Sequence, residues 1–266
     1  MFIYYLILIC SALGICIIFI RKKYGAGYFH VRFSKRYFGT AAARQKIPIE
    51  NSASAAMHCP AITLADESSK PQLNKTNKKD LKNAMEKAEA AKKRGDADSA
   101  EKNYVKVLSF DENNIEANLN LGLIYLKKGY AAKAEAIYKK LIELKCADAV
   151  IYSNLGNSLY QQQKLNDACE AYTKAADLDP QNPRRFMNLG KVLHEMGNFD
   201  GAIENINRAI SLDNNAEYSA TLADVYISLG NFSRAQELID QAFKIDKKNP
   251  AVRIVSKKLK TRKKRE

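Results

Sequence analysis

Three asparagines of this chain recur at one fixed spacing: Asn120, Asn154 and Asn188 lie 34 residues apart. A carboxamide donates and accepts hydrogen bonds at once, so a row of amides could hold the backbone of an extended peptide. Asparagine at a repeated position can instead support packing within the repeat, and both interpretations stay open. Sequence patterns of phosphate-binding loops, serine hydrolases, zinc proteases and dinucleotide-binding enzymes do not occur in the chain. We therefore predict a binding protein and not an enzyme.

The asparagine spacing is part of a longer pattern that repeats through most of the chain. One alanine marks each unit: Ala100, Ala134, Ala168, Ala202 and Ala235. In the second unit, apolar residues at three- and four-residue spacing indicate two amphipathic helices, one before Ala134 and one that includes it. Helix pairs repeated at this length predict a solenoid in which neighbouring units cover each other's apolar faces. We divide residues 81–249 into five units: 81–114, 115–148, 149–182, 183–215 and 216–249.

Glycine occurs at two positions of this pattern. The first is inside the expected first helix, at Gly122, Gly156 and Gly190, where glycine costs roughly 1 kcal/mol against alanine. Its recurrence there predicts close contact with the paired helix. The second position is the turn between the two helices, at Gly95, Gly129, Gly197 and Gly230. There we expect a left-handed C-cap, which suits glycine.

The third unit resembles a tetratricopeptide repeat (TPR). The resemblance rests on these residues: Tyr152, Leu155, Gly156, Leu159, Ala168, Tyr172, Ala175 and Pro180. It extends over about two thirds of the chain, and the first unit fits least well. The resemblance implies an all-α TPR solenoid of five helix-turn-helix repeats. It implies little about the ligand, because the family is a general scaffold for protein interactions.

In the TPR family, the asparagine side of each first helix lines a concave groove that binds peptides. By the same periodicity we assign ten residues to this groove: Asn120, Asn154, Asn157, Asn188, Arg184, Lys191, Leu119, Leu123, Tyr160 and Met187. They change from apolar in unit two to polar in unit three and basic in unit four, so Arg184 and Lys191 could attract an acidic segment. Unit five offers Glu217 and Thr221 instead of cations, which disfavours a clamp for the carboxylate tail of chaperones.

Residues 2–20 form an uncharged apolar segment, and as a helix they would extend roughly 28 Å, enough to cross a bilayer. No charged side chain precedes this segment and Arg21, Lys22 and Lys23 follow it, which is the reverse of a cleavable signal peptide. Residues 21–46 hold eight Lys or Arg and no acid, so the positive-inside rule places the repeats in the cytoplasm. We therefore predict a transmembrane anchor at residues 1–20.

The formal net charge of +14 comes from the two flanks of the repeats, since residues 81–249 are nearly neutral. Residues 21–46 mix aromatic and basic side chains, which suits a lipid headgroup layer. Residues 47–80 are predicted to be a flexible linker, and residues 250–266 a capping helix followed by a basic tail. Anionic lipid is a possible partner of both flanks. The tail could also be a solvated end or bind RNA, although nucleic acid is the less favoured partner.

The spacing of the cysteines and histidines in the sequence does not match that of a metal site. None of the five cysteines forms a CxxC pair, and His58 beside Cys59 alone is too little for a metal site. We predict no metal and no cofactor. Because the repeats are expected in the cytoplasm, no disulfide is expected either.

These observations predict a single-pass TPR adaptor that holds a protein segment at the cytoplasmic face of a membrane. We expect the bacterial inner membrane and a role in assembly or quality control. Two alternatives stay open. One is a receptor for precursor proteins on an organelle surface, and the other is a tether for RNA or ribosomes that works through the basic C-terminal tail.

Overall fold

The structure is a computed structural model that describes residues 9–10, 16–17 and 75–263. The chain divides into two compact units, residues 1–46 and 47–266, and each is considered by itself. In the first unit, strand β1 (Ile9–Cys10) pairs antiparallel with β2 (Cys16–Ile17). These four residues are extended, although they fall inside the anchor that was expected to be helical.

The other residues of the predicted anchor lie outside the described residues, as do the segment 21–46 and the linker up to residue 74. Among the helices that the structure does describe, none combines the length and the hydropathy needed to cross a bilayer. The transmembrane helix therefore stays a prediction.

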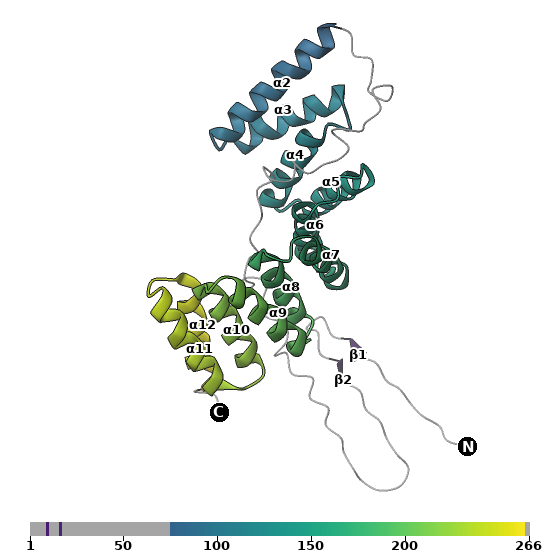
Figure 1. Ribbon diagram of the computed structural model, residues 1–266. Helices are drawn as coiled ribbons and strands as arrows, with labels where there is room; N and C mark the ends of the chain where they lie inside the picture. The colour runs from purple at the N-terminus through teal and green to yellow at the C-terminus, as the bar shows by residue number, and fades with distance from the viewer. Residues whose placement is uncertain (1–8, 11–15, 18–74, 264–266) are drawn as a thin grey trace, which may run out of the picture. The chain divides into compact units, whose positions relative to one another are not determined.

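The second unit is helical throughout its described part, residues 75–263 (Figure 1). Its helices are α2 (Lys75–Lys93), α3 (Ala97–Phe110), α4 (Ile115–Lys128), α5 (Ala131–Glu143), α6 (Ala149–Gln161), α7 (Leu165–Leu178), α8 (Pro183–Glu195), α9 (Phe199–Leu212), α10 (Ala216–Ser228), α11 (Phe232–Ile245) and α12 (Pro250–Lys263). Consecutive helices pack in pairs from α2–α3 to α10–α11, and α12 packs against both helices of the last pair. The all-α solenoid of five helix pairs with a capping helix is thus confirmed.

Two helix ends differ from the expectation. Helix α2 begins at Lys75, so residues 75–80 are helical and not part of a flexible linker. Thr76, Lys78 and Lys79 are exposed there, which shows that this first part of the helix extends beyond the packed part. Helix α12 continues to Lys263, beyond the point where an unpacked tail was expected. Lysine and arginine are good helix formers, so the basic sequence continues the helix without packing.

Short polar signals set most helix boundaries. A side chain at the N-cap accepts a hydrogen bond from a backbone N–H of the first turn at Asp96, Asn114, Asp148, Asn182, Asn198, Asn215 and Asn231. Such a bond satisfies one of the donors that a helix start leaves unpaired. The N-caps therefore fix where each of these helices begins.

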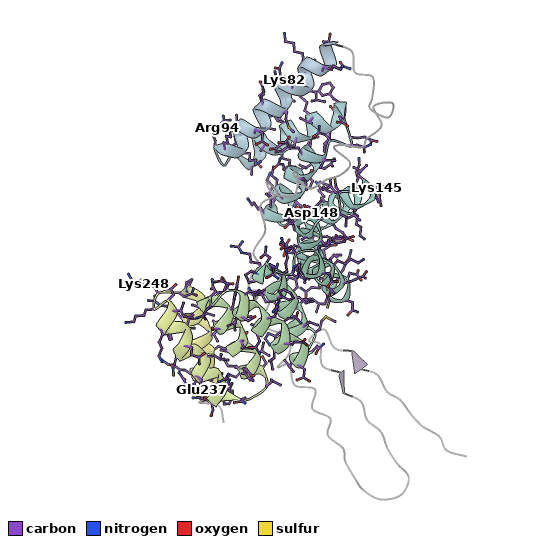
Figure 2. All side chains as sticks on the ribbon, in the orientation of Figure 1. Lys82, Arg94, Lys145, Asp148, Glu237 and Lys248 are labelled. Carbon is purple, nitrogen blue, oxygen red and sulfur yellow. The ribbon has the colours of Figure 1, made fainter. Side chains whose placement is uncertain are left out.

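The turns within the units use left-handed residues. Gly95, Gly129, Gly197 and Gly230 have φ between 76° and 80°, as predicted. Unit three has Gln163 at this position, with a φ of 65°. Lys145, in the turn between α5 and α6, also has a positive φ of 62° and is exposed (Figure 2). Left-handed backbone is uncommon for residues with a side chain. Gln163 nevertheless keeps the turn conformation that glycine has in the other units, and Lys145 adopts the same backbone conformation in a turn between units.

The apolar interior is formed by three connected clusters. The first spans units one and two, the second units two to four, and the third units four and five with α12. Tyr125 and Ile137 pack against the first and the second cluster, and Leu193 packs against the second and the third. Each unit therefore completes its core with residues of its neighbour, as a solenoid requires.

Within a unit, the two helices approach each other most closely at the glycine of the first helix. A Cβ atom on Gly156 would lie 2.6 Å from Cε1 of Tyr172, and one on Gly190 would lie 2.5 Å from Cγ1 of Ile206. Neither site has room for a methyl group unless the second helix moves. Each glycine destabilises its helix by roughly 1 kcal/mol relative to alanine, but the missing side chain permits this contact.

Units one, two and three have a tyrosine at one position of the second helix, and its hydroxyl needs a hydrogen-bond partner. Tyr172 Oη donates to Asn157 Oδ1 at 2.8 Å, and Tyr104 Oη donates to the Glu89 carboxylate. Both acceptors stand at the same place in the repeat, in the first helix of the tyrosine's own unit. This position therefore supplies a hydrogen-bond acceptor for the core in units one and three.

Unit two has Leu123 at the acceptor position. As a result, the Tyr138 hydroxyl is buried without a hydrogen-bond partner among the described residues. Burial also raises the pKa of Tyr138 well above its usual value. An unpaired buried hydroxyl is destabilising, so unit two lacks a stabilising hydrogen bond that units one and three have.

The contact at Gly156 predicts an asymmetry between two alanine substitutions. Gly156→Ala should lower the free energy of unfolding, because overpacking costs about 1–3 kcal/mol and exceeds the gain in helix propensity of about 1 kcal/mol. Gly122→Ala is the matched control, since its Cβ would lie 3.0 Å from the Tyr138 ring and would need a smaller shift. Urea unfolding followed by circular dichroism measures both, and equal stabilities would contradict the proposed contact.

The hydroxyl pattern predicts opposite effects of one chemical change. Tyr172→Phe should destabilise the protein by about 0.5–1.5 kcal/mol, because it removes a buried hydrogen bond. Tyr138→Phe should leave the stability unchanged or raise it, because it removes an unpaired hydroxyl. Thermal unfolding of the two variants side by side is the measurement. A larger loss for Tyr138→Phe than for Tyr172→Phe would show that the assigned partners are wrong.

Candidate functional site

The first helices of units two to five, from α4 to α10, form one side of the solenoid. Helix α4 contacts α6, α6 contacts α8, and α8 contacts α10, whereas the second helices of successive units make no comparable contacts. In a curved solenoid, the helices that lie closer together line the concave side. All ten predicted groove residues lie on α4, α6 and α8. The structure therefore places them on the helices that line this inner side.

The asparagine ladder is buried within the repeats. Its members are 4%, 0% and 1% exposed: Asn120, Asn154 and Asn188. Asn120 Nδ2 donates to the backbone oxygen of Glu116 at 3.0 Å, and Asn154 Oδ1 accepts from Asn157 Nδ2 at 3.3 Å. Asn188 Nδ2 lies 3.4 Å from the Ser153 hydroxyl oxygen across α8 and α6. These bonds support the packing interpretation that the sequence left open, and peptide contact by these amides stays a prediction.

The apolar members of the predicted groove are also buried: Leu119, Leu123, Tyr160 and Met187. Leu119 and Tyr160 belong to the second apolar cluster and Met187 to the third. Asn157 is 2% exposed and accepts the hydrogen bond of Tyr172 described above. These side chains thus contribute to the core, and little of their surface is exposed to a ligand.

The two predicted cations differ in their surroundings. Lys191 Nζ pairs with Glu217 Oε1 at 3.1 Å, and the side chain of Lys191 is 6% exposed. A buried ammonium needs such a partner, so Lys191 connects α8 to α10. Arg184 at the start of α8 is exposed, and it is the one member of the predicted set with an exposed side chain.

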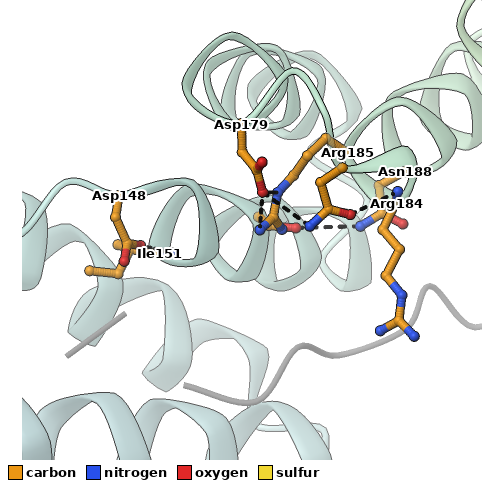
Figure 3. A network of polar contacts seen from close by, with 8 residues as sticks. Asp148, Ile151, Asp179, Arg184, Arg185 and Asn188 are labelled. Carbon is orange, nitrogen blue, oxygen red and sulfur yellow. Dashed lines mark hydrogen bonds and ion pairs between the residues drawn. The ribbon is translucent and has the colours of Figure 1, made fainter. Parts of the chain in front are cut away.

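Arg185, which follows Arg184, was not predicted to have a role. Its Nε and Nη2 atoms each donate to Asp179 Oδ2 at 3.2 Å, and Asn182 Nδ2 donates to the same oxygen at 3.0 Å. Figure 3 shows Arg185 directed toward Asp179, whereas Arg184 extends away from this network. The pair links the end of α7 to α8. The sequence gives no means of telling two adjacent arginines apart, because only the direction of their side chains distinguishes them.

A second polar link joins units two and three around Glu135 of α5. Its Oε2 atom accepts from Lys164 Nζ at 2.7 Å and from Gln162 Nε2 at 2.8 Å. Burial raises the pKa of Glu135, but hydrogen bonds from Lys139, Lys164 and Gln162 outweigh it and lower the pKa to about 2. Glu135 is therefore ionised at physiological pH and holds the turn between α6 and α7 against α5.

A cluster at the C-terminal end brings a histidine, a serine and an aspartate together. His194 Nε2 lies 2.9 Å from Ser228 Oγ, and burial lowers the pKa of His194. However, Ser228 Oγ donates to the backbone oxygen of Asp224 at 3.1 Å, and the Asp224 carboxylate pairs with Lys258. A nucleophilic serine would donate its proton to the histidine instead. The cluster therefore serves to join α8, α10 and α12.

Metal and thiol chemistry can be assessed only for the part of the chain that the structure describes. Within that part, no group of three or more His, Cys, Asp or Glu could hold a metal ion. Cys169 is a free, half-buried thiol whose pKa is raised by burial. Cys146 takes part in a disulfide, so the expectation that the chain has none is wrong at this residue. That expectation rested on the predicted cytoplasmic location.

Comparison with known structures places the fold among solved repeat proteins. A crystal structure of MamA is 27% identical, covers 64% of this chain and 93% of its own, and has a TM-score of 0.58. MamA of Desulfovibrio magneticus RS-1 is 16% identical over 64% of this chain and 97% of its own, with a TM-score of 0.61. YrrB, described as a TPR protein with an unusual peptide-binding site, is 19% identical over 64% and 88%, with a TM-score of 0.56.

No match was found among curated protein sequences. Comparison with protein families, in contrast, gives matches in most of the repeat region. A family model described as TPR repeat matches residues 156–197. A second family model, described as tetratricopeptide repeat, matches residues 115–145, 183–215 and 216–249. The helix pairs, their glycine contacts and these matches agree, and residues 115–145 and 156–249 of the chain are tetratricopeptide repeats.

Proposed function

We propose that this chain is a membrane-anchored scaffold that binds a segment of a partner protein along its first helices. The observation that carries the proposal is the contact of each first helix with the next, α4 with α6, α6 with α8 and α8 with α10, which makes one continuous inner side. Solenoids use such concave surfaces to bind extended partners. Among the similar structures, YrrB is described as having a peptide-binding site, although its low identity relates only the fold to this chain.

The exposed charge on this side differs between units, since α4 has Glu116 at the position that Arg184 holds in α8. Arg184 is exposed at the start of α8, and a guanidinium favours carboxylates through paired hydrogen bonds. Lys191 is already paired with Glu217, so it attracts an acidic group less strongly. The partner segment that fits best is therefore extended and acidic near the position that Arg184 reaches.

The membrane part of the proposal rests on the sequence. The apolar residues 2–20 and the eight basic residues that follow support a single-pass anchor with the repeats in the cytoplasm. The disulfide at Cys146 is unusual for a reducing cytoplasm and argues for the opposite side, and the protease experiment below decides between them. A flexible linker of some thirty residues would let the repeats reach partners on the order of 30 Å from the bilayer. A role in assembly or quality control at the bacterial inner membrane fits this arrangement.

Peptide selection tests the binding function. Random peptides displayed on phage are selected on the immobilised full chain in detergent, and the dissociation constants of enriched peptides are measured. Arg184→Glu should weaken acidic peptides about 10- to 100-fold, because a hydrogen bond to a charged group is worth about 1.5–3 kcal/mol. Lys106→Glu on α3 is the matched control, since Lys106 is exposed on a second helix. Equal binding by both variants would remove the inner side from the mechanism.

Protease access tests the topology. Trypsin added to intact cells or spheroplasts should leave residues 75–263 undigested, because the positive-inside rule keeps them in the cytoplasm. The same treatment after permeabilisation should digest the exposed turns, which is the control for protease activity. Fragments of the repeats produced from the outside of sealed spheroplasts would reverse the proposed orientation.

A further inference from the structure

Helix α12 carries charge of one sign, and the turn before it holds two lysines beside one acid, Asp246. Residues 247–263 contain no Asp or Glu and eight basic residues: Lys247, Lys248, Arg253, Lys257, Lys258, Lys260, Arg262 and Lys263. Lys258 is paired with Asp224 of α10. Lys248 lies in the turn and is exposed, as Figure 2 shows.

The two sides of α12 differ in character. The side that packs on α10 and α11 holds three side chains that are 0–1% exposed: Val252, Val255 and Leu259. Arg253, Lys257 and Lys260 are exposed and follow one another at four- and three-residue spacing, so they share the outer side. Ile254 lies beside them and is 65% exposed.

The usual reasons for charge on a terminal helix explain only part of this surface. The helix dipole favours cations near a helix C-terminus, which accounts for Lys247 and Lys248 behind α11 and for the last turn of α12. It does not account for Arg253, which lies in the first turn of α12, where positive charge is unfavourable, or for Lys257. A cap needs a polar outer face for solubility, and mixed charges would provide one. Helix α11 has such a mixture, with Arg234, Glu237, Asp240 and Lys244.

We infer that the outer side of α12 binds the anionic surface of a lipid bilayer. Exposed Lys and Arg are attracted to anionic headgroups, and their effects add along a surface of one sign. Ile254 fits the same partner, because an aliphatic side chain among cations gains free energy when it enters the headgroup boundary.

Nucleic acid is the poorer fit to these residues. Proteins that bind single strands combine basic residues with aromatic side chains on which the bases stack. Residues 247–263 contain no aromatic residue. In addition, Ile254 would gain nothing from a phosphate backbone. The bilayer is therefore the occupant that accounts for both the charge and the exposed apolar side chain.

This inference adds a second membrane contact to the proposed anchored scaffold but does not depend on its peptide site. An anchor at one end of the chain and a basic helix at the other would hold the solenoid against the bilayer. Because two contacts with one surface act at a high effective concentration, a weak contact through α12 would suffice.

Lysine footprinting on the full chain tests the inference. The chain is reconstituted in bilayer discs of phosphatidylcholine, with or without phosphatidylglycerol, and acylation of Lys257 and Lys260 is measured by mass spectrometry. The internal references are Lys102 and Lys106 of α3, which are exposed and lie far from α12 in the sequence. We expect protection of the α12 lysines only on the anionic discs, with loss of protection at high salt.

Two pairs of variants separate charge from apolar contact. Replacing Arg253, Lys257 and Lys260 with Glu should weaken binding of added anionic vesicles roughly a hundredfold, at about fivefold for each basic residue. The same change at Lys102, Lys106 and Lys127 is the control. Ile254→Asp should weaken vesicle binding more than Leu178→Asp, whose side chain is 53% exposed on α7.

Three results would overturn the inference: α12 lysines that acylate equally on neutral and anionic discs, equal effects of the two triple variants, and protection by polyuridylic acid without protection by anionic lipid. Flotation of the discs reports insertion of the anchor separately. A failed anchor and a failed α12 contact are therefore distinguishable, and circular dichroism of each variant shows whether the solenoid has kept its helicity.

Discussion

The close contact of two helices at one glycine is the constraint on which the three middle repeats depend, whereas units one and five have a buried alanine at this position, Ala88 and Ala223. At Gly156, the Tyr172 ring occupies the space that a β-carbon would need, so the second helix can approach only if this residue has no side chain. The short distance places the Tyr172 hydroxyl within reach of the first helix, where Asn157 accepts its hydrogen bond. One steric requirement therefore determines both the helix distance and the polar partner of the aromatic residue.

The links between units have a different character, since they combine shared apolar clusters with individual ion pairs. Tyr125 and Leu193 each pack against two clusters, which makes the interior continuous. The ion pairs change from junction to junction: Glu135 with Lys164, Arg185 with Asp179, Lys191 with Glu217, and Lys258 with Asp224. Partly buried pairs of this kind contribute little net stability, but breaking one leaves an uncompensated charge. They therefore help to fix which unit packs on which.

Sequence reasoning succeeded where a physical requirement recurs with the repeat. The helix pairs, the glycine contacts and the left-handed glycine turns could all be predicted, because sterics and backbone geometry act locally. It was less successful for the first residue of α2 and the last residue of α12, where basic residues extend a helix without an apolar pattern. It also could not separate Arg184 from Arg185, because adjacent residues on a helix point in different directions and their surroundings are set by tertiary packing.

The asparagines show why periodicity alone is a poor guide to a binding site. A residue that recurs at one position of successive units, here units two to four, meets a requirement that these units share, which is usually packing. Asn154 and Asn188 are almost fully buried and bonded within the solenoid, which fits this rule. Recognition of a particular partner requires residues that differ between units and remain exposed. Arg184 on the inner side meets both conditions, and Ile254 is exposed among the cations of α12, outside the repeats, so these two residues are the better evidence of function.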